Sequence, residues 1–419
     1  MEPEGRLAGI RLILAERAVR AIIALAFLVM VGFGVVLPIL ALYARSFGVG
    51  YGSAGLFVSA FALVRLGADL VAGPLVERFG ERRAAASGMV ITAIASFAAG
   101  LAPTFGLALV FWSAGGAGSA LLFAAFYSYL LKVVPSDRMA RTLGIFYGSF
   151  NGGMVAGGLA GGIVAHYLGL AAPLLLYAGI LAVAALAYLR FVPDPTGRAQ
   201  ELPMSTQQAE LERDMPILRR SRTTLARLFR TRGFATVLVV NLAYLWMIAA
   251  VFDTLVPLLG REELGMSTVA IGVVFAAALA TEFVILYPAG TAADRHGRKP
   301  VLLPALAGLA LMTVLIGWSP TPFLLGLGMA FLGIATGFAG VPPAAMLSDL
   351  TLSHGSGTAV GAFRFCGDLG LLLGPVVAGL SIDAFGFREA FAIAALPTII
   401  ALVLVARTPE TMPAQAHAP

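Results

Sequence analysis

Long apolar stretches separated by short polar turns dominate the chain from about residue 20 to its end. A helix that crosses the hydrocarbon core of a bilayer needs about 20 mostly apolar residues. Twelve stretches are long enough, and they lie roughly at 20–43, 53–76, 84–102, 105–133, 141–167, 171–192, 234–259, 268–291, 300–318, 321–349, 357–383 and 387–406. The pattern predicts an all-α membrane protein with twelve transmembrane helices.

Composition supports a membrane protein and argues against several kinds of chemistry. Of the 419 residues 59% are hydrophobic and 12% are charged, whereas soluble domains carry about a quarter charged residues. The single cysteine and four scattered histidines offer no metal-ligand spacing. Neither lysine follows the glycine of a phosphate-binding loop, and no HExxH or serine or cysteine with a nearby histidine suggests an enzyme. We expect no catalytic centre, no metal and no cofactor.

The positive charges favour one side of the predicted membrane. With the N-terminus inside, 23 of the 28 lysines and arginines fall in inner segments, three in outer loops and two within spans. This bias predicts a cell-membrane protein (inner or plasma membrane) with both termini cytosolic. The charged first 20 residues read as a cytosolic lead-in. The net charge of +6 is then a topology signal, and no nucleic-acid partner is expected.

The sequence repeats itself after 217 residues. Glycines coincide at this offset, among them Gly48 with Gly265, Gly80 with Gly297 and Gly169 with Gly386. Each repeat holds six spans, so the halves share one orientation, as in parallel-repeat transporters. We predict two pseudo-symmetric six-helix bundles at 1–192 and 234–419. The polar, arginine-rich segment 193–233 links them and is expected to include a short interfacial helix near 205–232.

Two charged turns occupy equivalent places in the repeats. "GTAADRHGRKP" follows the eighth span and a looser copy, "GPLVERFGERR", follows the second. Gly290 and Gly73 are expected to permit close approach of another backbone. Gly297 and Gly80 sit where a positive φ is accessible mainly to glycine. Each turn has an acid at the end of a helix, where it needs a partner because the helix dipole disfavours it.

The second turn is similar to the loop 2–3 signature of the major facilitator superfamily, and the resemblance extends over essentially the whole chain. The residues that carry it are Gly290, Asp294, Arg295, Gly297, Arg298 and Lys299, and in the first copy Gly73, Glu77, Arg78, Gly80 and Arg82. The first copy is degraded, because Glu77 replaces an aspartate and Glu81 stands where a basic residue is usual. The resemblance implies two turns that latch the cytosolic ends of the bundles when the transporter faces outward.

Glycine-rich segments resemble the efflux branch of that family. Gly153-x-x-x-Gly157-Gly158 in the fifth span is similar to the efflux-associated motif, with Gly158 in place of its proline, and Gly370-x-x-x-Gly374-Pro375 is the repeat equivalent. Drug/proton antiporters usually carry an arginine four residues before Gly116, where this chain has Trp112. The family's proton relay is therefore not transferable at that position.

Charged residues within spans are costly and mark candidate sites. The charged residues within spans that we take as candidates are Arg65, Asp69, Asp253, Glu282, Arg364 and Asp368. Two polar residues of the fifth span, Tyr147 and Asn151, could line a cavity and are candidates as well. Glu282 and Asp253 are the candidates for a protonatable site, since desolvation favours a neutral carboxyl. The pairs Arg65/Asp69 and Arg364/Asp368 either brace their own bundles or cross between bundles as a gate. Asp349 and Asp383, near span ends, are expected to be solvated or capping.

These features favour a secondary active transporter that works by alternating access and exports small amphipathic compounds in exchange for protons. It would act as a monomer in the lipid bilayer, with a small molecule and protons as its partners. An organic-anion or lysolipid transporter that uses Arg65 and Arg364 is one alternative. A non-transporting sensor or assembly protein on the same scaffold is another.

Overall fold

The computed structural model describes residues 16–134, 136–194, 226–351 and 356–412, and within them the chain is helical. Three of the long helical segments are interrupted, at Leu37–Ile39 (η1), at the π-helix Ile248–Leu255 (η2) and near Val341. The α-helices are α2 Arg17–Val36, α3 Leu40–Arg45, α4 Tyr51–Phe79, α5 Glu81–Gly100, α6 Phe105–Val133, α7 Ser136–Leu168, α8 Ala172–Phe191, α11 Phe234–Met247, α12 Val256–Glu262, α13 Thr268–His296, α14 Arg298–Ile316, α15 Pro322–Gly340, α16 Pro342–Thr351, α17 Ser356–Phe385 and α18 Phe387–Arg407.

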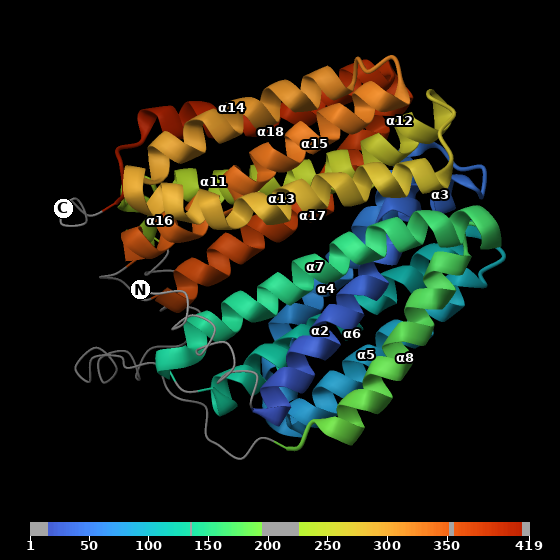
Figure 1. Ribbon diagram of the computed structural model, residues 1–419, viewed down its shortest axis with the longest axis vertical. Coiled ribbons are helices and arrows are strands. Elements are labelled where there is room, and N and C mark those ends of the chain that lie inside the picture. The colour runs from blue at the N-terminus through green and yellow to red at the C-terminus, as the bar shows by residue number, and fades with distance from the viewer. Residues whose placement is uncertain (1–15, 135, 195–225, 352–355, 413–419) are drawn as a thin grey trace. The chain divides into compact units, whose positions relative to one another are not determined.

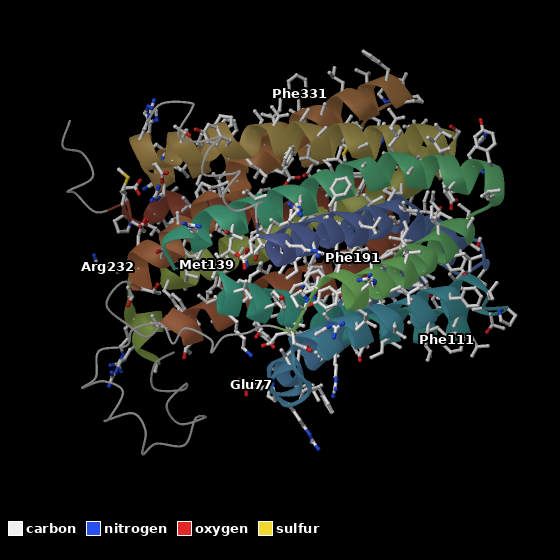
Figure 2. The ribbon with its side chains drawn as sticks, turned by 60° about the horizontal axis from the view of Figure 1, so that its bottom comes forward. Glu77, Phe111, Met139, Phe191, Arg232 and Phe331 are labelled. Carbon is white, nitrogen blue, oxygen red and sulfur yellow. The ribbon has the colours of Figure 1, made fainter. Side chains whose placement is uncertain are left out.

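The predicted spans agree with these helices to within a few residues at most ends. Eleven helical segments of the described chain are long and apolar enough to cross a membrane, and the 33-residue α7 covers the remaining predicted span. Apolar side chains such as Phe111 and Phe331 project away from the helices (Figure 2), with 37% and 52% of their surface exposed. Outward-facing apolar side chains are expected where hydrocarbon is the solvent.

Contacts divide the chain into two compact units. Unit 1 comprises Met1–Gln200 and Val256–Leu279, and unit 2 comprises Glu201–Leu255 and Ala280–Pro419. Within unit 1, α5 packs on both α6 and α8, and α2 packs on α7 and α8 (Figure 1). Within unit 2, α11 packs on α17, and α14 packs on α15 and α18.

Small residues bring helices of unit 1 into backbone contact. A Cβ added at Gly157 or Gly161 on α7 would lie 2.2 Å from the carbonyl oxygen of Val31 or 2.0 Å from that of Val35 on α2. No real side chain tolerates such distances, so the glycine-rich stretch is what allows α7 to pack against α2.

The backbone keeps the predicted repeat. The described glycines with positive φ include three pairs at the 217-residue offset: Gly48 with Gly265, Gly80 with Gly297, and Gly169 with Gly386. Gly80 (φ 81°) and Gly297 (φ 99°) form the bends of the two charged turns, as the sequence predicts. The predicted close backbone approach is not found at Gly73 or Gly290 within the described residues, where a Cβ at Gly73 would meet nothing within 4 Å and one at Gly290 would meet only Val341 Cγ1 at 3.7 Å.

Candidate functional site

A carboxyl group lies between helices of unit 2, and the described part of the chain shows no ion pair to it. The Tyr244 hydroxyl on α11 donates a hydrogen bond of 2.7 Å to Oε1 of Glu282 on α13. Oε2 of Glu282 is buried, and no hydrogen-bond partner among the described residues reaches it. A buried acceptor left unpaired is costly and calls for an explanation. Glu282 is therefore the strongest candidate for a group that binds a proton or a ligand.

Glycines on α15 make room for this contact. A Cβ added at Gly340 would lie 2.8 Å from the Tyr244 hydroxyl oxygen, and one added at Gly337 would lie 2.8 Å from Ile285 Cβ. The position of the tyrosine hydroxyl thus depends on the absence of a side chain at residue 340. The sequence did not single out Gly340 or pair Tyr244 with Glu282.

Asp253 lies in the π-helical segment η2, where the wider turn leaves the regular α-helical bonding pattern. Its residue surface is 6% exposed, and its Oδ1 has no hydrogen-bond partner among the described residues. The neighbouring Thr254 hydroxyl donates to the Ala249 carbonyl, five residues earlier, at 3.0 Å. π-helical turns are frequent at functional sites, and this one holds the second unpaired carboxyl oxygen of unit 2.

Unit 1 has a cation near the middle of α4. Arg65 Nε lies 3.9 Å from Asp69 Oδ2, one turn away, and its guanidinium carbon lies 5.7 Å from the centroid of the Phe123 ring on α6. Nε itself is buried without a hydrogen-bond partner in the described chain. The pair within the helix is thus present but loose, and Arg65 retains a donor.

The other predicted site residues are spread over both units. Tyr147 and Asn151 lie one turn apart on α7 in unit 1, and the Tyr147 side chain is 51% exposed. Arg364 and Asp368 lie one turn apart on α17 in unit 2. The crossed pairs Asp69–Arg364 and Arg65–Asp368 would join the two units, and they stay a prediction. Two further polar side chains of α11 are held by backbone carbonyls, since Asn241 donates to that of Phe363 at 2.7 Å and Trp246 to that of Ala394 at 3.1 Å.

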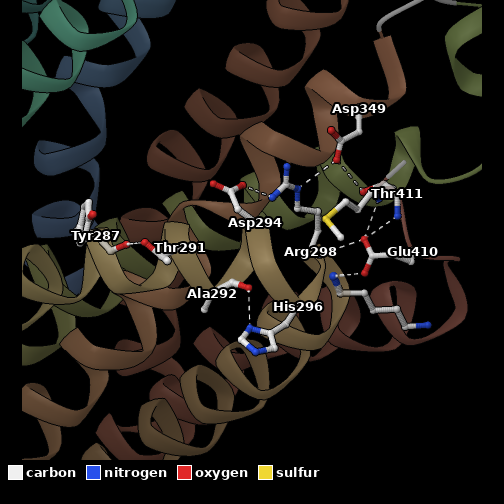
Figure 3. A network of polar contacts seen from close by, with 11 residues as sticks. Tyr287, Thr291, Ala292, Asp294, His296, Arg298, Asp349, Glu410 and Thr411 are labelled. Carbon is white, nitrogen blue, oxygen red and sulfur yellow. Dashed lines mark hydrogen bonds and ion pairs between the residues drawn. The ribbon is translucent and has the colours of Figure 1, made fainter. Parts of the chain in front are cut away.

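The second charged turn is the centre of a polar network (Figure 3). The Arg298 guanidinium contacts the carboxylate of Asp294, and its Nε lies 3.2 Å from Oδ2 of Asp349 on α16. Asp294 thus has the arginine partner that its place at a helix end requires. The expectation that Asp349 is solvated or capping is wrong, because its side chain is only 12% exposed and pairs with Arg298.

The segment after α18 completes this network. The Glu410 carboxylate accepts hydrogen bonds from the backbone N–H groups of Arg298 (3.1 Å) and Lys299 (2.9 Å), the first residues of α14. It also accepts from the N–H groups of Thr411 and Met412. Burial of the carboxyl opposes ionisation, but these four backbone donors prevail and lower the pKa of Glu410. Nothing in the residue pattern pointed to this contact, which joins residues that are 111 and 112 positions apart.

The first charged turn has partners of its own. Lys132 Nζ contacts Oε1 of Glu81, and the Ser128 hydroxyl donates to the same oxygen at 2.8 Å. Arg82 donates to the Leu189 carbonyl and lies 3.6 Å from Asp194 Oδ2. Glu81 stands where the family usually has a basic residue, but it forms an ion pair with Lys132. The first turn is therefore not merely a degraded copy.

Unit 1 holds one more ion pair that sequence reasoning missed. Arg45 Nε lies 3.0 Å from Oε1 of Glu262, and the Tyr51 hydroxyl donates to the other carboxylate oxygen at 3.1 Å. The Arg45 guanidinium also lies 4.1 Å from the centroid of the Tyr51 ring. Arg45 and Glu262 are separated by the repeat length of 217 residues, and that spacing was the available signal.

Comparison with known proteins assigns this helical architecture to a protein family. The family model of the Major Facilitator Superfamily matches residues 22–284 and 261–419. The chain is 25% identical over 140 residues to a quinolone resistance protein NorA of Staphylococcus aureus and 36% identical over 116 residues to the multidrug resistance protein MdtG of Salmonella typhi. These matches span 33% and 27% of this chain, and only 36% and 28% of the relatives' own lengths.

Solved structures share the fold over nearly the whole chain. A bacterial homologue of the human lysosomal transporter Spinster superposes with a TM-score of 0.76 at 14% identity and covers 92% of this chain and 95% of its own. The human organic anion transporter MFSD10 superposes with a TM-score of 0.63 at 18% identity and covers 93% and 99%. With the family model matching most of its length, the chain is a multi-pass membrane protein that belongs to the Major Facilitator Superfamily of transporters.

Proposed function

We propose that the protein is a secondary active transporter that exports small amphipathic compounds in exchange for protons. The observation that carries the proposal is the Glu282 carboxyl, which is held by Tyr244 at one oxygen and is buried and unpaired at the other. A buried carboxyl without a cation is accommodated at lower cost when it is neutral. The carboxyl would therefore release its proton when a substrate binds beside it or when a solvated pathway reaches it.

The transport cycle would use the duplicated architecture. Residues 1–192 and 234–419 act as the two moving bundles, joined by 193–233, and expose the site alternately on each side of the membrane. The protein would act in the cell membrane as a monomer, and its arginine distribution favours an orientation with both termini cytosolic. The similarity to NorA and MdtG, which are named as resistance proteins, supports the direction of transport.

Uptake of a lipophilic cationic dye into inverted membrane vesicles tests this function. An imposed pH gradient, acidic inside, should drive accumulation by the wild-type protein. Glu282→Gln should abolish it, and Asp253→Asn should reduce it, whereas Glu389→Gln at the exposed start of α18 should behave as wild type. Gradient-driven uptake that persists in Glu282→Gln would refute the assignment of this carboxyl.

Arg65 supports a second candidate function. Its unpaired Nε and its place beside the Phe123 ring suit an amphipathic anion such as an organic acid or a lysolipid, in which case Arg364 would contribute from unit 2. Saturable flux of an anionic dye that is lost in Arg65→Gln and Arg364→Gln, but kept in Glu282→Gln, would favour this function over proton-coupled export. Absence of any flux from a correctly folded protein would favour a non-transporting role.

A further inference from the structure

In the ion pair between Glu81 and Lys132, the glutamate is almost completely buried. The Glu81 side chain is 3% exposed, and its Oε1 contacts Lys132 Nζ and the Ser128 hydroxyl. Glu81 is the first residue of α5, and Lys132 lies in the last turn of α6. The pair therefore fastens the bend at Gly80 to the end of α6 within unit 1.

Addition of the repeat length of 217 to these two numbers gives Arg298 and Asp349. Those residues form the equivalent ion pair in unit 2, with 3.2 Å between Arg298 Nε and Asp349 Oδ2 and side chains only 13% and 12% exposed. The two repeats thus hold the same contact at the same two places with the charges exchanged. Position 81 therefore keeps an ion-pair partner, and the signs of the two charges are exchanged relative to the second repeat.

Helix dipoles explain why the second pair needs extra support. An acid at the start of α5 and a base at the end of α6 both match the helix dipoles, whereas Arg298 at the start of α14 and Asp349 near the end of α16 both oppose them. In unit 2 the opposing field is offset by Asp294 and by Glu410, whose carboxylate accepts the N–H groups of Arg298 and Lys299. Unit 1 supplies that negative charge through Glu81 itself.

Another contact is shared by both repeats without change. Arg82 donates to the Leu189 carbonyl near the end of α8, and Lys299 Nζ donates to the Ala406 carbonyl near the end of α18 at 2.8 Å. Residues 82 and 299, and residues 189 and 406, differ by the repeat length. Both turns are therefore anchored to the last helix of their own half, so the anchoring geometry of the first turn is intact.

We propose that the Glu81–Lys132 ion pair is the working equivalent of the Arg298–Asp349 pair with its charges exchanged, and that Glu81 and Lys132 are positioning residues that transport requires. The pair makes the α4–α5 turn and the end of α6 move as one body. Loss of Lys132 leaves a carboxylate enclosed without its cation, and such a change is far more disruptive than loss of a surface pair. The inference rests on the proposed transport function for its kinetic part and on the ion pair alone for its structural part.

A charge-exchange cycle tests this inference in the full-length protein. Glu81→Gln and Lys132→Met remove one partner each, and Glu81→Lys combined with Lys132→Glu restores the pair with reversed sign. Lys132→Arg keeps the charge, and Arg83→Gln, at an exposed neighbour, serves as the matched control. Purified variants are compared by thermal unfolding and, in vesicles with equal amounts of protein, by initial rates of dye transport over a range of dye concentrations.

The inference predicts that each single neutral variant lowers the unfolding temperature by several degrees and loses most of its maximal rate, with little change in the half-saturating dye concentration. Lys132→Arg should retain more rate than Lys132→Met, and the exchanged pair should exceed both single variants in rate and unfolding temperature. Wild-type rates in Glu81→Gln and Lys132→Met would overturn it, as would equal losses in Lys132→Arg and Lys132→Met. A wild-type protein that moves no dye would sink the proposed function, while the unfolding temperatures would still decide whether the pair is coupled.

Discussion

Arg65 in unit 1 and Glu282 in unit 2 occupy the same place in the two repeats, yet their surroundings are opposite. Arg65 has an acid one turn away and the ring of Phe123 beside it. Glu282 has the hydroxyl of Tyr244 and no cation in contact among the described residues. The repeat equivalents of Phe123 and Tyr244 are Gly340 and Phe27. In the first repeat the ring of Phe123 lies beside the Arg65 cation. In the second repeat Gly340 leaves room for the Tyr244 hydroxyl, which donates to Glu282.

At positions 65 and 282 the two repeats therefore keep a charged residue but not the sign of its charge. The same exchange appears at 81/298 and at 132/349, where the ion pair survives with its sign reversed. At the turns an exchange costs little, because both partners changed together. At positions 65 and 282 only Arg65 has an oppositely charged residue one turn away, so the second repeat is left with the carboxyl that we propose as the proton site.

The largest effect is expected when Glu282 is given the charge of its repeat equivalent. Glu282→Arg places a cation beside the Tyr244 hydroxyl, where the described residues show no acid in contact with position 282, and an unpaired charge in such a place costs about 3–5 kcal/mol. We expect little folded protein by size-exclusion chromatography. Arg65→Gln, which leaves Asp69 38% exposed, should fold, and equal yields of the two variants would contradict the comparison.

Gly340→Ala tests the space that unit 2 reserves for the tyrosine. The added Cβ would lie 2.8 Å from the Tyr244 hydroxyl oxygen, so the hydroxyl must move away from Glu282 at a cost of about 1–3 kcal/mol. The unfolding temperature and the gradient-driven transport rate should both fall. Gly361→Ala on α17, where a Cβ meets nothing within 4 Å, is the matched control and should leave both unchanged.

Tyr244→Phe gives the second repeat the ring that the first repeat has at Phe27. It removes the 2.7 Å hydrogen bond to Oε1 of Glu282, worth about 1–1.5 kcal/mol, without a change of shape. We expect a several-fold slower gradient-driven transport and a shifted pH profile of the rate. Tyr127→Phe, at an exposed residue of α6, should leave the profile in place, and identical profiles for both variants would remove Tyr244 from the site.

The smallest effect concerns Glu410, which caps α14, whereas the first repeat has the largely exposed Asp194 beside Arg82. Because folding lowers the pKa of Glu410, its contribution is present above the pKa of the unfolded chain and is lost as pH falls through the lower pKa of the folded state. Glu410→Gln should lower stability by about 1 kcal/mol or less at neutral pH and by nothing in strong acid. A Glu410→Gln effect that grows in acid would contradict the linkage.

Much of the architecture follows from the sequence because the bilayer imposes it. Span length, the 217-residue repeat and the bends at Gly80 and Gly297 were all readable from apolar runs and glycines. The helix faces were not, since 59% hydrophobic residues make lipid-facing and core-facing sides alike. Tyr244 and Glu282 lie on different helices, and Glu410 reaches α14 from beyond the last helix, so only the packed chain reveals these contacts. From the sequence Glu81 looked like a departure from the loop 2–3 signature, because that signature does not include position 132, where its lysine partner lies.

The release of protons on substrate binding tests the central claim most directly. Dye is added to purified protein in a weakly buffered detergent solution that contains a pH indicator. If the Glu282 carboxyl exchanges its proton for substrate, wild type and Glu389→Gln should acidify the solution in proportion to bound dye, whereas Glu282→Gln should bind dye without acidification. Proton release from Glu282→Gln equal to that of wild type would contradict the account.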